Sequence, residues 1–96
     1  MGDGALATFE RGETALRQAK YSEAIGCYLR VVRAAPEFMR ARFRVADCLL
    51  NYKARAQALE IYKGVAWHCI KAGQPLSALV AIKMAAALEP STHLEA

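Results

Sequence analysis

Residues 9–36 read FERGETALRQAKYSEAIGCYLRVVRAAP, and the spacing of the apolar and small side chains in this stretch decides the fold. Six of these positions are matched in size class by the residues found 34 positions later. The first copy consists of Phe9, Gly12, Leu16, Ala24, Tyr28 and Val31, and the second of Phe43, Ala46, Leu50, Ala58, Tyr62 and Val65. Repetition at a fixed period predicts stacked copies of one supersecondary unit that share a continuous core.

Each part of this pattern has helical rather than strand periodicity, because apolar residues recur every three to four positions and no run alternates with period two. The predicted helices cover residues 4–19, 22–35, 38–52, 55–72 and 75–88. Ser22 is a candidate N-cap, Gly73 suits the residue after a helix, and Pro75 suits the first turn of the next helix. Short connections of this kind place consecutive helices as antiparallel neighbours.

The chain resembles the tetratricopeptide-repeat (TPR) family at these positions. The family pattern of a small residue, an alanine, an aromatic and a proline is matched by Gly12, Ala24, Tyr28 and Pro36, and then by Ala46, Ala58 and Tyr62, with Ile70 in place of the proline. The resemblance implies one all-α domain over residues 1–96, built as a right-handed stack of antiparallel helix hairpins. Its repeats would cover about residues 5–38 and 39–72, with a shortened third at about 59–92 that shares helix 55–72. The alternative is an ordinary helical bundle in which the spacing is accidental.

Composition narrows the functional classes. Hydrophobic residues make up 55% of the chain, and the formal charge of +4 is scattered rather than gathered in runs. The three cysteines, Cys27, Cys48 and Cys69, lie in apolar helical patterns and are expected to be buried thiols. The N-terminal MGDGALATFE does not have the form of a secretory signal, and the apolar stretch 76–88 is too short to span a bilayer. We therefore expect a soluble cytoplasmic protein without a membrane partner.

Residues that could carry chemistry do not form a convincing set. His68 and Cys69 are adjacent, so on a helix they point about 100° apart and cannot share one metal ion. Asp47, Cys48 and His68 could in principle supply an orienting group, a nucleophile and a base. The simpler interpretation makes Cys48 a core residue and Asp47 a surface or groove residue. We therefore expect that the chain is not an enzyme and that it needs no metal or cofactor.

The resemblance instead implies a groove that binds a peptide or domain of another protein. The groove positions carried over from the family are Leu6, Phe9, Glu13, Leu16 and Arg17 in the first repeat, Arg40, Phe43, Asp47, Leu50 and Asn51 in the second, and Lys63, Trp67 and Lys71 in the third. Those expected to bind the partner are Glu13, Arg17, Arg40, Phe43, Asp47, Asn51, Lys63 and Trp67. Family members that clamp a terminal carboxylate use Lys and Asn where this chain has Phe9 and Glu13, and then Phe43 and Asp47. Binding of a heat-shock chaperone tail is therefore not implied, and the expected function is that of an interaction module or scaffold.

Two other functions remain open. One is a TPR chaperone of the kind that serves bacterial secretion systems. The other is weak nucleic-acid binding, suggested by the charge and by Arg40, Arg42 and Arg44. Helical periodicity puts Arg40 and Arg44 on one face and Arg42 elsewhere, and aromatic side chains are not interleaved with them, so nucleic acid is the less favoured partner.

The segment 75–88, PLSALVAIKMAAAL, has only Ser77 and Lys83 as polar residues. A terminal helix of a repeat array is expected to carry a polar outer face, and this one does not. The exposed apolar surface predicts a homodimer, or cover by a downstream domain if the chain, which closes with STHLEA, is an N-terminal fragment of a longer protein. The expected contact residues are Leu79, Val80, Ile82, Met84 and Ala86.

Overall fold

The structure is a computed structural model that describes residues 3–89. Over this range the chain is all-helical, and its elements are α1 (Asp3–Arg17), α2 (Tyr21–Ala34), α3 (Met39–Asn51), α4 (Arg55–Lys71) and α5 (Pro75–Leu88). The five predicted helices are confirmed, and their ends differ from the prediction by no more than two residues. His93, the closing STHLEA and the end of the shortened third repeat lie outside the described residues.

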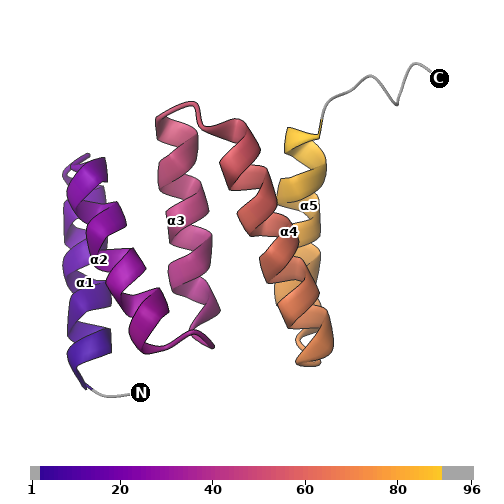
Figure 1. Ribbon diagram of the computed structural model, residues 1–96, viewed down its shortest axis with the longest axis horizontal. Helices are drawn as coiled ribbons and strands as arrows, with labels where there is room; N and C mark the ends of the chain where they lie inside the picture. Colours follow the sequence, from indigo (N-terminus) through magenta and orange to yellow (C-terminus); the bar gives the residue numbers. More distant parts are fainter. Residues whose placement is uncertain (1–2, 90–96) are drawn as a thin grey trace.

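Consecutive helices run in opposite directions and pack chiefly on their neighbours in the sequence (Figure 1). α1 lies behind α2 at one end, α5 lies behind α4 at the other, and α3 stands between the two pairs. The body is flat, with extents of 49 × 31 × 17 Å.

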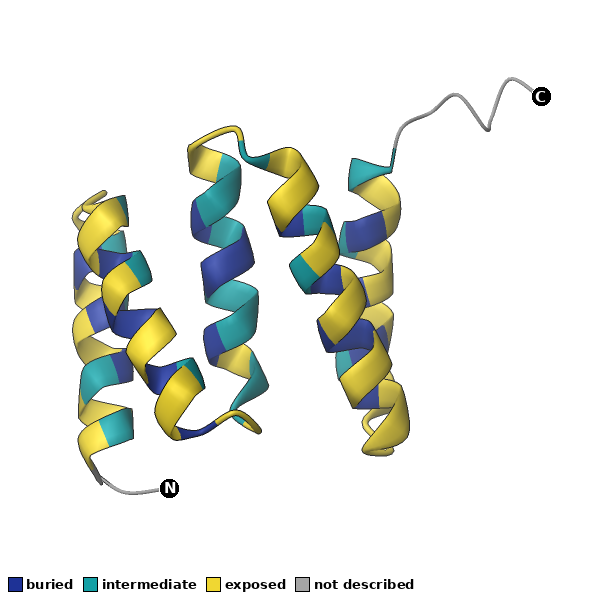
Figure 2. Cartoon of the chain, in the orientation of Figure 1, coloured by how far each residue is buried: buried dark blue, intermediate teal, exposed yellow. Residues whose placement is uncertain are grey.

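The buried core extends along the stack in the same order as the helices, and α3 lies at its centre (Figure 2). One buried cluster joins α1, α2 and α3 around Phe9 and Tyr28. Two more join α4 to α5 and to α3, and one of them is built around Tyr62. Tyr28 and Tyr62 are both 0% exposed. Each of them packs between its own hairpin and the next helix, because it shares a cluster with the helix that follows its hairpin.

Three of the four connections use the same turn. Ala19, Lys53 and Gly73 have positive φ values of 59°, 59° and 72°. The residue after each donates its backbone N–H to a carbonyl five positions earlier, at N···O distances of 2.9, 3.0 and 2.8 Å. This is the Schellman arrangement, in which backbone groups close the end of a helix. Gly73 and Pro75 hold the positions predicted for them.

The predicted cap at Ser22 is wrong. α2 begins one residue earlier, at Tyr21, and the residue before it is Lys20, which forms no side-chain capping bond. The tight turn at Ala19 brings the chain into the next helix before Ser22 is reached. The backbone carbonyl of Lys20 then accepts the first bond of α2, from the N–H of Ala24 at 2.9 Å.

Cys27, Cys48 and Cys69 are buried free thiols, as expected from their positions in the apolar pattern. No helix within the described range has both the length and the apolar character needed to cross a bilayer.

Candidate functional site

Two carboxylates lie among the helices of the first two repeats, and each accepts a hydrogen bond from a buried tyrosine. The hydroxyl of Tyr28 donates to Glu13, and that of Tyr62 donates to Asp47 Oδ1 at 2.6 Å. Both pairs are 15 residues apart in sequence. Since Glu13 and Asp47 are themselves 34 residues apart, the 34-residue repeat includes a polar contact as well as the apolar packing positions.

Arg44 links the two carboxylates. Its Nε donates to Glu13 Oε2 at 2.9 Å, and its Nη1 donates to Asp47 Oδ2 at 3.2 Å. The side chain of Glu13 is only 16% exposed, so burial raises its pKa. The hydrogen bonds from Tyr28 and Arg44, with the positive charges of Arg44 and Arg40, together outweigh this effect of burial and leave the pKa of Glu13 below its ordinary value of 4.5. This network therefore stabilises the ionised carboxylate and ties α1, α2, α3 and α4 together.

Beside the network, a groove of about 360 Å³ opens between α3 and α5. It is lined by Arg40, Phe43, Arg44, Asp47, Ser77, Val80 and Met84. Phe43, Val80 and Met84 give it apolar walls, while Arg40 and Arg44 add positive charge. The guanidinium carbon of Arg40 lies 5.1 Å from the centre of the Phe9 ring, a cation–π contact that holds the side chain in place.

The residues predicted to bind a partner do not all meet at this groove. Arg40, Phe43 and Asp47 line it, and Glu13 reaches it only through Arg44. Arg17 and Asn51 are outside its lining, and each is hydrogen-bonded within its own helix. Arg17 Nη2 donates to Thr14 Oγ1 at 3.1 Å, and Asn51 Nδ2 donates to the backbone carbonyl of Asp47 at 3.2 Å.

Lys63 and Trp67 belong to α4, which contributes no residue to the groove lining. Lys63 Nζ pairs with Glu89 at 3.1 Å, next to the end of α5. Trp67 is 57% exposed, and the ammonium of Lys71 lies 4.4 Å from its ring centre. Phe9, which the resemblance put in the groove, is instead buried in the core.

The residues predicted for self-association divide between two sides of α5. Val80 and Met84 line the groove, and Met84 also packs against the cluster around Tyr62. Leu79, Ile82 and Ala86 are exposed and do not line it. Arg44 and Ser77 also line the groove, although Ser77 was not expected at a site and Arg44 was considered only for nucleic-acid binding. Arg44 could have been found from its spacing, since it is one helical turn from both Arg40 and Asp47.

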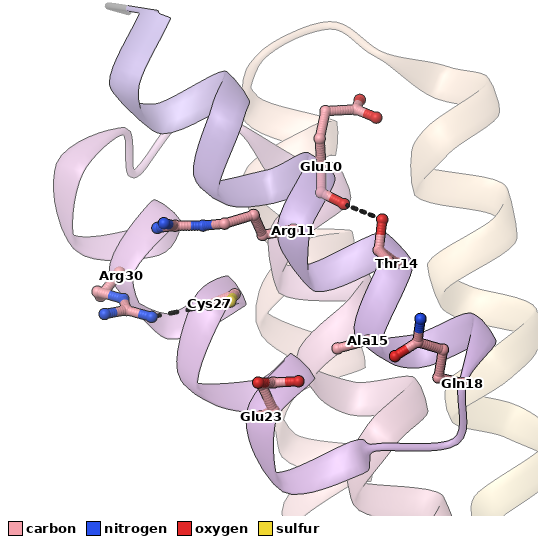
Figure 3. A pocket seen from close by; sticks show the side chains of 8 residues that line it. All are labelled: Glu10, Arg11, Thr14, Ala15, Gln18, Glu23, Cys27 and Arg30. Carbon is pink, nitrogen blue, oxygen red and sulfur yellow. Dashed lines mark hydrogen bonds between the residues drawn. The ribbon is translucent and has the colours of Figure 1, made fainter.

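A second hollow, of about 450 Å³, lies between α1 and α2 (Figure 3). Its lining residues are Glu10, Arg11, Thr14, Ala15, Gln18, Glu23, Cys27 and Arg30. The figure shows charged side chains of both signs, those of Glu10, Arg11, Glu23 and Arg30, spread around the hollow. Although this hollow is larger, the groove beside α5 is the better candidate site because it combines apolar walls with a few charged side chains, those of Arg40, Arg44 and Asp47.

The reactive candidates are not activated. Burial, with the charge of Asp47, raises the pKa of the Cys48 thiol to about 11, so the nucleophilic thiolate is scarce near neutral pH. His68 is exposed and lies edge-on to Trp67. Among the residues that the structure describes, no three His, Cys, Asp or Glu side chains gather closely enough to hold a metal ion.

A scan against protein-family models and searches of curated proteins and of solved structures found no match to this chain. The side chains of the groove are therefore the basis for assigning a function.

Proposed function

We propose that this chain is a protein-interaction module of the tetratricopeptide type, and that the groove between α3 and α5 receives a short segment of another protein. The repeated register supports the structural part of the proposal, because the polar pairs Tyr28–Glu13 and Tyr62–Asp47 recur at the same spacing as the apolar positions. The groove supports the functional part. The module works as a scaffold in the cytoplasm, where its thiols stay reduced.

The charge at the groove specifies the chemistry of the segment. Arg44 pairs with both Glu13 and Asp47, whereas Arg40 forms no ion pair with any described side chain, although its charge helps to lower the pKa of Glu13. Arg40 thus presents a guanidinium without an ion-pair partner beside the apolar side chains of Phe43, Val80 and Met84. A peptide with an apolar side chain for these walls and a carboxylate for Arg40 fits both features. The position of Arg40, without an ion-pair partner beside an apolar wall, is the observation on which the proposal rests.

A groove of this size holds one or two side chains, so the affinity is modest and depends strongly on each contact. Reversing the charge at Arg40 removes an attraction and adds a repulsion. The loss is about 1.4 kcal/mol or more, which is about tenfold in Kd.

The test begins with a random peptide display library selected on the immobilised protein. Peptides that combine an aliphatic or aromatic residue with Asp or Glu should be enriched. Calorimetric titration of one such peptide should show at least about tenfold weaker binding to Arg40→Glu. Arg55→Glu, a matched charge reversal at an exposed residue of α4 outside the groove, should bind as the unmodified protein does.

Equal weakening of peptide binding by both variants would show that the net charge of the protein, and not the groove, determines binding. Enrichment of basic peptides would contradict the proposed role of Arg40. Salt-sensitive binding of random single-stranded RNA, lost in Arg40→Glu, would favour nucleic-acid binding instead.

A further inference from the structure

The groove between α3 and α5 has two chemically different ends. Because consecutive helices run in opposite directions, α3 and α5 run in the same direction and begin at the same end of the stack (Figure 1). Arg40 and Ser77 line the groove near the starts of these two helices. Asp47 and Met84 line it seven residues further along each helix. A guanidinium therefore marks one end of the groove, and a carboxylate marks the other.

Of the two carboxylates that share Arg44, Asp47 has more capacity left for a ligand. Arg44 donates twice to Glu13, at 2.9 and 3.4 Å, and once to Asp47, at 3.2 Å. The positive charge of Arg40 also acts on Glu13, whose pKa it helps to lower. The side chain of Glu13 is 16% exposed, whereas that of Asp47 is 36% exposed. Asp47 is therefore the less compensated and the more accessible of the two.

Asp47 can also accept further hydrogen bonds. Its Oδ1 accepts one from the hydroxyl of Tyr62, and its Oδ2 accepts one from Nη1 of Arg44. An ionised carboxylate has about four acceptor positions, so about two are left for a ligand. The neighbouring lysines do not fill them, since Lys63 pairs with Glu89 and Lys83 is exposed outside the groove lining.

Between its two ends the groove is apolar. Phe43 and Val80 each lie three residues, about one helical turn, beyond Arg40 and Ser77. Ser77 adds a hydroxyl at the Arg40 end, where it can donate to a carboxylate. Along its length the groove therefore offers hydrogen-bond donors, then apolar side chains, then an acceptor.

The distance between the ends sets the spacing of the ligand's side chains. Seven residues of helix rise about 10.5 Å. In an extended chain the residues i, i+2 and i+4 face the same side and span about 13 Å, a difference that long side chains can bridge. A groove of about 360 Å³ accepts the side chains of an extended segment rather than a whole helix, which is about 10–12 Å wide.

We propose that the groove selects an extended segment in which an acidic, an apolar and a basic side chain stand at every second position. The acidic side chain pairs with Arg40, the apolar one lies against Phe43 and Val80, and the basic one pairs with Asp47. This inference rests on the proposed function and adds to it the basic residue and its spacing. Asp47 is then a specificity-determining residue, because it repels a second acidic side chain at its end of the groove.

Three synthetic peptides with blocked termini test the basic position by calorimetric titration. In the first, Asp, Leu and Lys alternate with Ser. In the second, Met replaces Lys and removes its charge. The unmodified protein should bind the first about two- to fivefold more tightly, as expected for an ion pair that stays partly exposed. In the third, Lys directly follows Asp and so points away from the groove, and this peptide should bind no better than the second.

Asp47→Asn should remove the preference for Lys over Met, while its amide oxygen can still accept the hydrogen bond from Tyr62. Glu37→Gln is the matched control, since it removes one negative charge at an exposed residue outside the groove lining. It should keep the preference. Thermal unfolding of both variants shows whether they are folded, and the comparison of peptides on the unmodified protein does not depend on either.

Equal affinity of the unmodified protein for the Lys and Met peptides would overturn this inference. So would tight binding of the third peptide, or a preference for Lys that a folded Asp47→Asn variant retains. In each of these cases the proposed function would still hold if Arg40→Glu weakened the binding of every peptide. A failure of all three peptides to bind would instead count against the proposed function itself, and the inference would fall with it.

Discussion

Glu13 and Asp47 hold the same place in successive repeats, and each is joined to a buried tyrosine and to Arg44. Two tyrosine hydroxyls in an apolar core need acceptors, and the carboxylates supply them. One guanidinium between two carboxylates then compensates part of the charge. The network leaves no buried side-chain nitrogen or oxygen without a partner among the described residues. It therefore fixes how the first hairpin sits on the second.

The lowered pKa of Glu13 predicts a loss of stability in acid. Because the folded-state pKa lies below the ordinary value of 4.5, the stabilisation from this carboxylate is present above pH 4.5 and is lost as the pH falls through the folded-state pKa. Glu13→Gln removes this contribution. The variant should be less stable than the unmodified protein at about pH 6, and the difference should shrink towards about pH 3.

Urea denaturation at several pH values measures this effect. Glu37→Gln is the control, since Glu37 is exposed between α2 and α3 and forms no ion pair with a described residue. A difference between Glu13→Gln and the unmodified protein that stays constant over the whole pH range would show that the stabilisation does not depend on the charge of Glu13.

At the scale of single elements, Gly12 sets the distance between α1 and α2. A Cβ atom added there would lie 2.8 Å from Tyr28 Cε1 and 3.2 Å from Cys27 Cβ. The ring of Tyr28 cannot move aside, because it is fully buried and its hydroxyl is bonded to Glu13. The equivalent residue of the second repeat is Ala46, which is also buried. The first hairpin is therefore the one that requires a glycine.

Gly12→Ala should destabilise the protein, since overpacking costs about 1–3 kcal/mol and exceeds the gain of up to about 1 kcal/mol from better helix propensity. Gly64→Ala is the matched change in α4, where nothing lies within 4 Å of the added Cβ. It should stabilise by about 0.5–1 kcal/mol. Denaturant melts of the two variants give the comparison. Stabilisation by both variants would show that helix propensity alone determines the effect, and that α1 and α2 are not closely packed.

Most of the secondary structure could be predicted because it depends on the spacing of apolar residues and on residues that favour turns. The apolar spacing predicted the five helices, and Gly73 and Pro75 predicted the residues of the turn between α4 and α5. The prediction of a cap at Ser22 failed because Ala19 adopts a positive φ, a conformation in which alanine is not expected, and Lys53 does the same in the turn before α4. The backbone closes those turns, so no capping side chain is needed.

For the whole molecule, the sequence could not assign the two sides of α5. With Ser77 and Lys83 as its only polar residues, the helix has no polar face to mark which side meets water. Val80 and Met84 were therefore grouped with Leu79 and Ile82, although only the first two line the groove with α3. That division depends on where α5 docks on α4, which helical periodicity does not encode. As a result, one side of α5 lines the groove, and the side with Leu79 and Ile82 is an exposed apolar surface.

The central claim is that the groove between α3 and α5 binds an apolar segment bearing a carboxylate. The most direct measurement is a two-dimensional ¹H–¹⁵N NMR titration of the protein with a display-selected acidic peptide. The largest backbone shifts should fall on Arg40, Phe43, Val80 and neighbouring residues, while the α1–α2 hollow stays unchanged. The account would be contradicted by shifts centred on that hollow or on Leu79 and Ile82 of α5, or by a peptide that binds without causing specific shifts.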